Sequence, residues 1–239
     1  MKFTVKHYHY FEQMDGKGQQ LANVQGWDHL YIDSEDNFYF IPGERKEWEK
    51  KRARHPELAE NARDIIEIAR ENNFKRINSV GVCTALLELN LKKQAPDIYL
   101  ACSDYTPGAM KRLRHIFSEC EECNVFDMLE DEWKPVDNTL WLMFRVDTEF
   151  SDEQWKSLFS RMSGAGIKDV LFVPSVFFGW YYFLSEIVVN TWHRLNGRHP
   201  SFAGYVRTRD TVKSFWAGNY RLNKQYALGK LTGYLLEKI

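Results

Sequence analysis

The sequence has little cysteine and almost no net charge, and each shortage excludes a class of protein. Its 239 residues include four cysteines, and their spacing matches no disulfide framework of a secreted domain. The 32 basic and 33 acidic residues leave a formal net charge of −1, with both signs interspersed along the chain. Because proteins that bind nucleic acid usually present a basic face, we expect no nucleic-acid partner.

The sequence also lacks a long uninterrupted apolar run. Residues 2–10 are polar and aromatic and have no apolar core of the kind found in secretion signals, so we expect a cytoplasmic protein. The most apolar stretch, 170–192, is interrupted by a proline, a glycine, a glutamate and an asparagine. A membrane-spanning helix needs about 20 apolar residues. We therefore expect a buried strand followed by an apolar helix, and no membrane partner.

Residues 77–107 have the pattern of a nucleotide-binding unit. An apolar, β-prone segment leads to Gly81, which permits a tight turn, and residues 85–92 have helical spacing. Residues 98–102 form an apolar run typical of a parallel strand buried on both faces, and Asp104 follows it. At such a turn the backbone can approach a ligand, and a carboxylate after the second strand can accept hydrogen bonds from ribose hydroxyls.

The alternation of helix and strand continues through most of the chain. Helices are predicted over 44–54, 56–72, 108–120, 151–162 and 208–217, and further strands over 123–126, 139–144, 169–173, 220–228 and 231–238. Gly229-Lys230 can turn the last two strands into a hairpin. The pattern predicts an α/β fold with a doubly wound, mostly parallel sheet and a C-terminal antiparallel hairpin. Residues 1–43 are expected to be an irregular arm with a short strand at 38–41.

Over residues 57–239 this order resembles the class I, Rossmann-like, S-adenosylmethionine-dependent methyltransferases. Four segments carry the resemblance: the turn SVGVCTA around Gly81, the run Asp104-Tyr105-Thr106-Pro107, residues 124–128 (NVFDM), and the closing helix and hairpin. The resemblance implies S-adenosylmethionine as cofactor and a Rossmann-like domain over 57–239, preceded by an arm and helical cap over 1–56. The residues that it implies for cofactor binding are Gly81, Val82, Cys83, Asp104, Tyr105, Asp127, Met128 and Phe144.

The glycine turn departs from the pattern of that family. Ser79 stands where an acidic residue is usual, and Cys83 and Ala85 replace the second and third glycines. A catalytically silent, methyltransferase-like binding subunit is therefore an alternative to a working enzyme.

Two acidic residues after the strand 139–144 are the candidates for catalysis. Asp147 and Glu149 follow this strand at the edge where an acceptor would meet the transferred group, and either could remove the acceptor's proton. Cys120-x-x-Cys123 matches half of a zinc site, but the sequence offers no second pair. We expect these two cysteines to be structural and no metal to be bound.

The function that this pattern favours is methyl transfer to an oxygen or nitrogen of a small-molecule acceptor. An enzyme alternative keeps the pocket but transfers an aminopropyl or aminocarboxypropyl group, as in spermidine or nicotianamine synthases, with Asp147 and Glu149 binding a cationic acceptor. Residues 175–207, which include Trp180 and Tyr182, are interpreted as an insertion that forms the acceptor pocket or the face of a homodimer.

Overall fold

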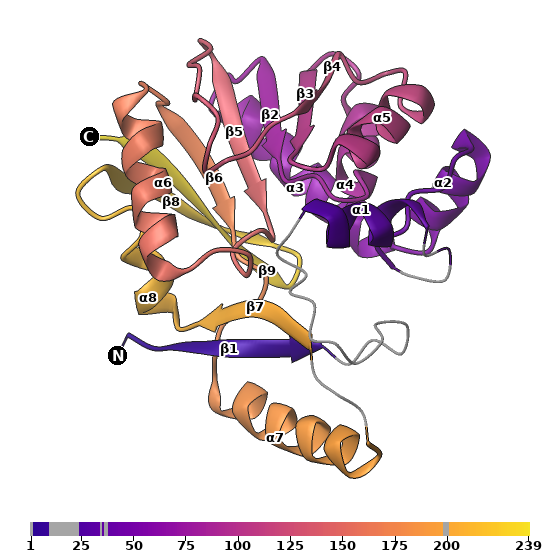
Figure 1. Cartoon of the computed structure of the whole chain (residues 1–239). Coiled ribbons are helices and arrows are strands. Elements are labelled where there is room, and N and C mark those ends of the chain that lie inside the picture. The colour runs from indigo at the N-terminus through magenta and orange to yellow at the C-terminus, as the bar shows by residue number, and fades with distance from the viewer. Residues whose placement is uncertain (1, 10–23, 34, 36–37, 198–200) are drawn as a thin grey trace.

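The computed structural model describes residues 2–9, 24–33, 35, 38–197 and 201–239, and its largest element is a seven-stranded sheet with helices on both faces (Figure 1). In chain order the strands of this sheet are β2 (Arg76–Val80), β3 (Tyr99–Asp104), β4 (Glu122–Val125), β5 (Thr139–Phe144), β6 (Asp169–Val173), β8 (Tyr220–Leu228) and β9 (Leu231–Lys238). Their order across the sheet is β4-β3-β2-β5-β6-β9-β8. The first five are parallel, and β9 runs antiparallel to both β6 and β8. The predicted α/β fold with a closing hairpin is confirmed.

The strand order reverses its direction of winding between β2 and β5. The chain winds from β2 outward to β3 and β4, then returns to β5 on the other side of β2 and continues to β6. In open sheets of this kind, ligands bind beyond the carboxyl ends of the strands at the point where the winding reverses. That point lies beyond Val80 and Phe144, the last residues of β2 and β5.

The sheet is buried on both faces. Along β5, Leu140 and Leu142 pack against one set of helices, and Trp141 and Met143 pack against the other. The first set consists of α1 (Val24–Ile32), α2 (Arg45–Ala53), α3 (Pro56–Glu71), α4 (Leu86–Gln94) and α5 (Pro107–Ile116). The second set consists of α6 (Asp152–Gly164) and α8 (Arg209–Lys213).

The predictions for two segments, 38–41 and 208–217, are wrong. Residues 38–41 form no strand. The Ile41 N–H donates to the Tyr31 carbonyl oxygen at 2.8 Å, and the Ile41 carbonyl oxygen accepts from Arg112. This segment is therefore bonded to α1 and α5 by isolated hydrogen bonds and not by a strand ladder. The helix predicted over 208–217 ends at Lys213, because Phe215 turns into the core with its N–H bonded to Val212 three residues earlier.

The N-terminal arm also contains a strand that was not predicted. Strand β1 (Thr4–His9) pairs antiparallel with β7 (Ser201–Arg207) and forms a two-stranded ribbon. The ribbon lies against the loop after β5, where the Tyr205 N–H donates to the Thr148 carbonyl oxygen at 2.9 Å. A side chain at Gly204 would meet that same oxygen at 2.2 Å, so only glycine permits this approach. Residues 10–23 of the predicted arm lie outside the described residues.

Helix α7 (Trp180–Leu195) lies on the other side of the ribbon from the large sheet (Figure 1). It belongs to the segment 175–207 that was interpreted as an insertion. The ribbon and α7 together form an appendage next to the loop that carries the two candidate catalytic residues.

Candidate functional site

The loop that joins β2 to α4 has an unusual backbone. Gly81, Cys83 and Ala85 have φ values of 72°, 53° and 52°, so every second residue is left-handed. For a residue with a side chain this conformation costs about 1–2 kcal/mol, so the surrounding contacts must hold Cys83 and Ala85 in it. The N–H groups of Gly81 and Val82 both donate to the Ser103 carbonyl oxygen, at 2.8 and 3.2 Å. At the three positions where the family that the sequence resembles has glycine, this chain therefore keeps the left-handed backbone that glycine favours.

An acidic side chain reaches the place where the sequence has Ser79. Glu88, in the first turn of α4, is buried, and its Oε1 accepts a hydrogen bond from Ser79 Oγ at 2.6 Å. Burial raises the pKa of Glu88 to about 7, with a smaller contribution from the charge of Asp104. Glu88 thus places a carboxyl group beside Ser79, a contact that no pattern in the sequence marks.

Asp104 ends β3 directly beside the loop. Its Oδ2 accepts from the Cys83 N–H at 3.1 Å, and its Oδ1 accepts from the Thr106 N–H at 3.1 Å and from Thr106 Oγ1 at 2.7 Å. The side chain is buried, and this desolvation raises its pKa although the hydrogen bonds oppose the shift. Asp104 therefore lies at the carboxyl end of β3, and its carboxylate orders the loop backbone.

Three tyrosines surround this loop: Tyr31, Tyr39 and Tyr105. The Tyr31 hydroxyl lies near the Cys83 thiol, and burial raises the pKa of Tyr31 well above its usual value. Helix α1, which carries Tyr31, is held over α5 because Asp28 Oδ1 accepts from the Gly108 N–H at 3.1 Å. The N-terminal helix therefore covers the loop.

The end of β4 contributes Asp127 and Met128. Asp127 Oδ1 accepts from the Leu129 N–H at 2.8 Å, which leaves its second oxygen for another donor. Met128 is buried, and its Cε would lie 3.7 Å from a Cβ built on Gly81. Val146 comes closer, because its Cγ1 would lie 2.6 Å from that same Cβ. Gly81 thus gives room to a side chain of the neighbouring β5 loop.

In the loop after β5, Asp147 is fully buried. Its Oδ1 accepts from both the N–H and the Oγ of Ser175, each at 2.7 Å, and its Oδ2 has no partner among the described residues. The guanidinium of Arg207, also fully buried, donates to the carbonyl oxygens of Asp147 and Phe150 and, at 2.6 Å, to Asp152 Oδ1. Desolvation raises the pKa of Asp147. These contacts join the end of β6 and the ribbon to the loop.

Glu149 faces the other carboxylates of the site. Desolvation raises its pKa to about 7, and the negative charges of Asp104 and Asp147 add to the shift. Its charge in turn raises the pKa of Tyr105 and Tyr39. Glu149 is therefore a carboxyl group that changes protonation near neutral pH next to the loop and the tyrosines.

The structure brings most of the sequence-predicted residues to one edge of the sheet. Gly81, Val82, Cys83, Asp104, Tyr105, Asp127, Met128 and Glu149 lie at the carboxyl ends of β2 to β5, with Phe144 as the last residue of β5. Asp147 is instead directed to Ser175. Tyr31 and Arg145 were not predicted, since no local pattern marks them; the φ of Arg145 is 61°.

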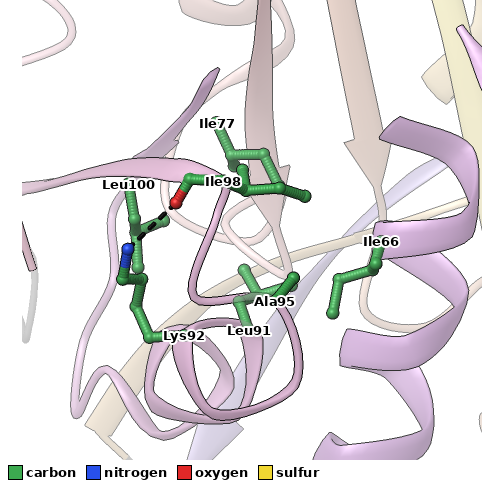
Figure 2. A pocket seen from close by; sticks show the side chains of 7 residues that line it. All are labelled: Ile66, Ile77, Leu91, Lys92, Ala95, Ile98 and Leu100. Carbon is green, nitrogen blue, oxygen red and sulfur yellow. Dashed lines mark hydrogen bonds between the residues drawn. The ribbon is translucent and has the colours of Figure 1, made fainter. Parts of the chain in front are cut away.

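A small hollow lies at the opposite end of the sheet, between α3, α4 and the starts of β2 and β3 (Figure 2). Its wall includes Lys92, whose Nζ donates to the Ile98 carbonyl oxygen at 3.0 Å. The hollow leaves no room for a water molecule. We therefore assign no ligand site there.

Two other searches of the described residues concern metals and membranes. No group of three or more His, Cys, Asp or Glu in this part of the chain is arranged to hold a metal ion. None of the described helices has the length and apolar character needed to cross a membrane.

Comparisons with known proteins identify the fold. No family model matches the sequence, and no curated protein is similar enough in sequence to match it. Among solved structures, the mitomycin 7-O-methyltransferase MmcR aligns with 93% of this chain and 62% of its own, with a TM-score of 0.60 and 12% identity. Human N-acetylserotonin methyltransferase, solved in complex with S-adenosylmethionine, aligns with 74% of this chain and 51% of its own, with a TM-score of 0.57 and 15% identity.

A third similar structure is an O-methyltransferase family 2 protein from Planctomyces limnophilus in complex with apigenin, with a TM-score of 0.52 and 14% identity over 69% of this chain and 50% of its own. The chain thus has the fold of S-adenosylmethionine-dependent methyltransferases. It spans between 50% and 62% of the length of these three structures.

Proposed function

We propose that this protein transfers a methyl group from S-adenosylmethionine to an oxygen or nitrogen of a small-molecule acceptor. One observation carries the proposal: the loop after β2 keeps three left-handed residues, at positions 81, 83 and 85, directly beside the carboxylate of Asp104. A left-handed backbone at residues with side chains, such as Cys83 and Ala85, is uncommon in loops. Such strained residues occur preferentially at ligand sites. Its place at the winding reversal of the sheet supports a nucleotide ligand.

The residues of this edge fit the parts of that cofactor. Asp104 would accept from the ribose hydroxyls, and the backbone of residues 81–83 would lie along the amino-acid portion. Asp127, whose Oδ1 accepts from the Leu129 N–H, would accept from the adenine amino group through its other oxygen, and Tyr105, Met128 and Phe144 would pack on the ring. When bound, the cofactor supplies a methyl group on a positively charged sulfur, so the protein's main task is to place the acceptor in line with it.

Glu149 is the residue that we assign as general base. A base works best when its pKa lies near the operating pH, and Glu149 has a pKa of about 7. Asp147, at full burial and bonded to Ser175, would act by positioning: together with Arg207 it fixes the loop that presents Glu149. Both were candidates from the sequence, and their surroundings favour different roles.

The test is a titration of the purified protein with S-adenosylmethionine and S-adenosylhomocysteine, followed by thermal unfolding. Ligand at about 100 times its Kd stabilises the native protein by about 2.7 kcal/mol. Asp104→Asn should abolish this stabilisation, whereas Asp97→Asn, on an exposed turn before β3, should leave it intact. The absence of any ligand-dependent rise in the wild-type protein would contradict the proposal.

A second candidate is a cofactor-free scaffold with the same fold. The observation that favours it is the position of Val146, whose Cγ1 would lie 2.6 Å from a Cβ on Gly81, so that a protein side chain occupies the space in front of the turn. In that case neither nucleotide stabilises the protein. If binding is found, product analysis follows: S-adenosylhomocysteine supports methyl transfer, and methylthioadenosine would indicate aminopropyl or aminocarboxypropyl transfer instead.

We also infer a homodimer formed through the outer face of α7. This face consists of large apolar side chains at helical spacing: Trp180, Phe183, Leu184, Ile187, Val188, Trp192 and Leu195, each between 37% and 82% exposed. It carries no charge, so burying it against a second copy would desolvate no ionic group. The inner face, with Tyr182 bonded to His7, is the polar one.

Light scattering with size-exclusion chromatography tests the dimer. Val188→Glu should convert the dimer to a monomer, whereas Val136→Glu, at a similarly exposed valine in the loop before β5, should not. If Val188→Glu lowers acceptor affinity without changing the mass, α7 lines the acceptor pocket and the dimer is refuted.

A further inference from the structure

Three of the four cysteines come together at the outermost strand of the sheet, β4, and its neighbour β3. Cys102 on β3 and Cys123 on β4 are directly paired in the parallel register of these two strands. Cys120 lies on the turn between α5 and β4, and its Sγ contacts the carbonyl oxygens of Glu122 at 3.0 Å and Leu100 at 3.4 Å. The three thiols lie close enough to one another to shift each other's pKa.

The position of this thiol cluster, Cys102, Cys120 and Cys123, makes it reachable. Strand β4 is the outermost strand of the sheet, so one of its sides has no neighbouring strand. Cys120 is partly exposed on its turn, Cys123 is 8% exposed, and Cys102 is 1% exposed. All three are free thiols. A small oxidant would therefore reach the cluster from the turn.

The three thiols differ in reactivity. Hydrogen bonds from Cys102 and then Cys120 lower the pKa of the Cys123 thiol, and the positive charge of Arg114 acts in the same direction. Arg114 is fixed there because its Nε donates to the Cys123 carbonyl oxygen at 2.6 Å. Burial instead raises the pKa of Cys102 well above its usual value. Since the thiolate is the nucleophile and the guanidinium of Arg114 lies beside Cys123, we take Cys123 as the reactive member.

The fourth cysteine provides a contrast within the same chain. Cys83 has no cysteine among the groups that act on it, and burial raises its pKa to about 12. It therefore has neither a thiolate at neutral pH nor a partner for a disulfide, and serves as an internal reference.

We propose that the thiol cluster is a site of reversible oxidation by peroxide, with Cys123 as the attacking thiol and Cys120 as the resolving thiol. In the first step the Cys123 thiolate attacks one peroxide oxygen, the O–O bond breaks, and hydroxide leaves, so that sulfur becomes a sulfenic acid. In the second step the Cys120 thiol displaces this oxygen as water and a disulfide forms. In total two thiols and one hydrogen peroxide give one disulfide and two waters.

Cys120 is assigned as the resolving thiol because it can move. A disulfide needs Cβ atoms about 3.5–4.5 Å apart. Cys102 is held in the interior of β3, which is hydrogen-bonded to a strand on each side, whereas Cys120 lies on a turn and Cys123 is the second residue of the edge strand β4. Closing Cys120 onto Cys123 therefore displaces only the turn. This inference does not depend on methyl transfer.

The experiment treats the full-length native protein with hydrogen peroxide, blocks the remaining thiols with iodoacetamide, and maps the peptides by mass spectrometry. We expect loss of two of the four free thiols and a linkage between Cys120 and Cys123, reversed by dithiothreitol, with Cys83 remaining a free thiol and Cys102 alkylated only after denaturation. Unchanged Cys120 and Cys123 under native conditions, or reaction of Cys83 at the same rate, would overturn the proposal.

Two variants test the order of the steps. In Cys120→Ser the sulfenic acid on Cys123 has no resolving partner on the turn, so dimedone should trap it there. In Cys123→Ser no disulfide should form. Thermal unfolding of each variant shows whether it is folded, and if Cys123→Ser is not, the dimedone adduct in Cys120→Ser still decides the question. A dimedone adduct on Cys120 of the wild-type protein, or a disulfide that persists in Cys123→Ser, refutes the assigned roles.

Discussion

Helices α6 and α7 both carry several large apolar side chains, but only α6 buries them. Trp155, Leu158, Phe159 and Met162 of α6 are fully buried against the sheet and α8. In α7 the corresponding side chains point away from the protein, and Leu195 is 82% exposed. Figure 1 shows α6 against the large sheet and α7 beyond the ribbon of β1 and β7.

The two helices are held by different contacts. Burial of apolar surface, at about 25 cal/mol per Å², fixes α6. Among the described residues, the inner face of α7 makes polar contacts, since Tyr182 Oη lies 2.6 Å from His7 Nδ1 and Glu186 lies 3.4 Å from the same nitrogen, and the Tyr182 ring also lies 6.2 Å from that of Phe178. We therefore expect α6 to determine the stability of the chain and α7 to determine its association.

The largest expected effect is the contrast between Trp155→Ala and Trp180→Ala. Trp155 is fully buried and its Nε1 donates to the Asp147 carbonyl oxygen at 3.1 Å, so its removal should lower the free energy of unfolding by about 3–5 kcal/mol. Trp180 is 74% exposed, and its removal should change the same quantity by less than about 0.5 kcal/mol. Urea unfolding at low protein concentration measures both.

Protein concentration sharpens this comparison. If α7 pairs with a second copy, Trp180→Ala should become more destabilising as the protein concentration rises, because association stabilises the folded state by mass action. Trp155→Ala should show no such trend. Equal destabilisation by the two variants in dilute solution would show that α7 is packed within one chain.

A second contrast concerns buried charge. Glu88 is buried in the body of the protein with a pKa of about 7, above its usual value of 4.5, whereas Glu186 in α7 is 26% exposed beside His7. Since the folded protein holds the Glu88 proton more tightly than the unfolded chain does, ionisation of Glu88 destabilises the fold. This destabilisation should be absent below about pH 4.5 and should lower the free energy of unfolding by about 3 kcal/mol above about pH 7.

Glu88→Gln tests this by removing the charge while keeping an oxygen that accepts from Ser79. The wild-type free energy of unfolding should fall relative to that of the variant as the pH rises from 4.5 to 7, and the difference should stay constant above pH 7. Glu153→Gln, at an exposed position of α6, is the control and should follow the wild-type curve. A constant difference across this whole range would mean that Glu88 has no raised pKa.

The body of the fold was predictable from sequence because local patterns determine it. The bounds of β5, β6, β8 and β9 agree with the predictions residue for residue, since each strand is an apolar run or one arm of a tight hairpin. The appendage was not predictable in this way. Strand β1 pairs with β7 near the other end of the chain, and no local pattern marks such a partner. The apolar composition of α7 predicts a helix but not which side of it is covered.

The candidate site shows the same division. The turn at Gly81 and the carboxylate of Asp104 follow from the strand–turn–helix pattern and from the family resemblance. The contact of Glu88 with Ser79 depends on how α4 packs on β2, and the meeting of Cys102 with Cys123 depends on the register of β3 and β4. These relations are tertiary, so no spacing in the sequence expresses them.

A third, smaller contrast concerns the N-terminal caps of α6 and α7. Helix α6 begins with a complete capping box, in which Ser151 Oγ accepts from the Gln154 N–H at 3.2 Å and Gln154 Oε1 accepts from the Ser151 N–H at 2.8 Å. Ser151→Ala should lower the free energy of unfolding by about 1 kcal/mol, because it leaves a helix N–H without its partner. Ser214→Ala, beyond the end of α8, is a matched control. Loss of the same size in both variants would mean that the cap has no special role.

The smallest expected effect is a gain at the start of α7. Its N-cap residue, Gly179, has no side chain to cap the helix, although its φ of −145° and ψ of 171° suit a serine and a Cβ there would meet no atom within 4 Å. Gly179→Ser should stabilise α7 by only a few tenths of a kcal/mol. Hydrogen exchange should show slower exchange in the first turn of α7, while the global free energy of unfolding stays the same, because α7 opens without unfolding the sheet. A global gain as large as the loss in Ser151→Ala would instead mean that α7 unfolds together with the body, and the division between the two helices would fail.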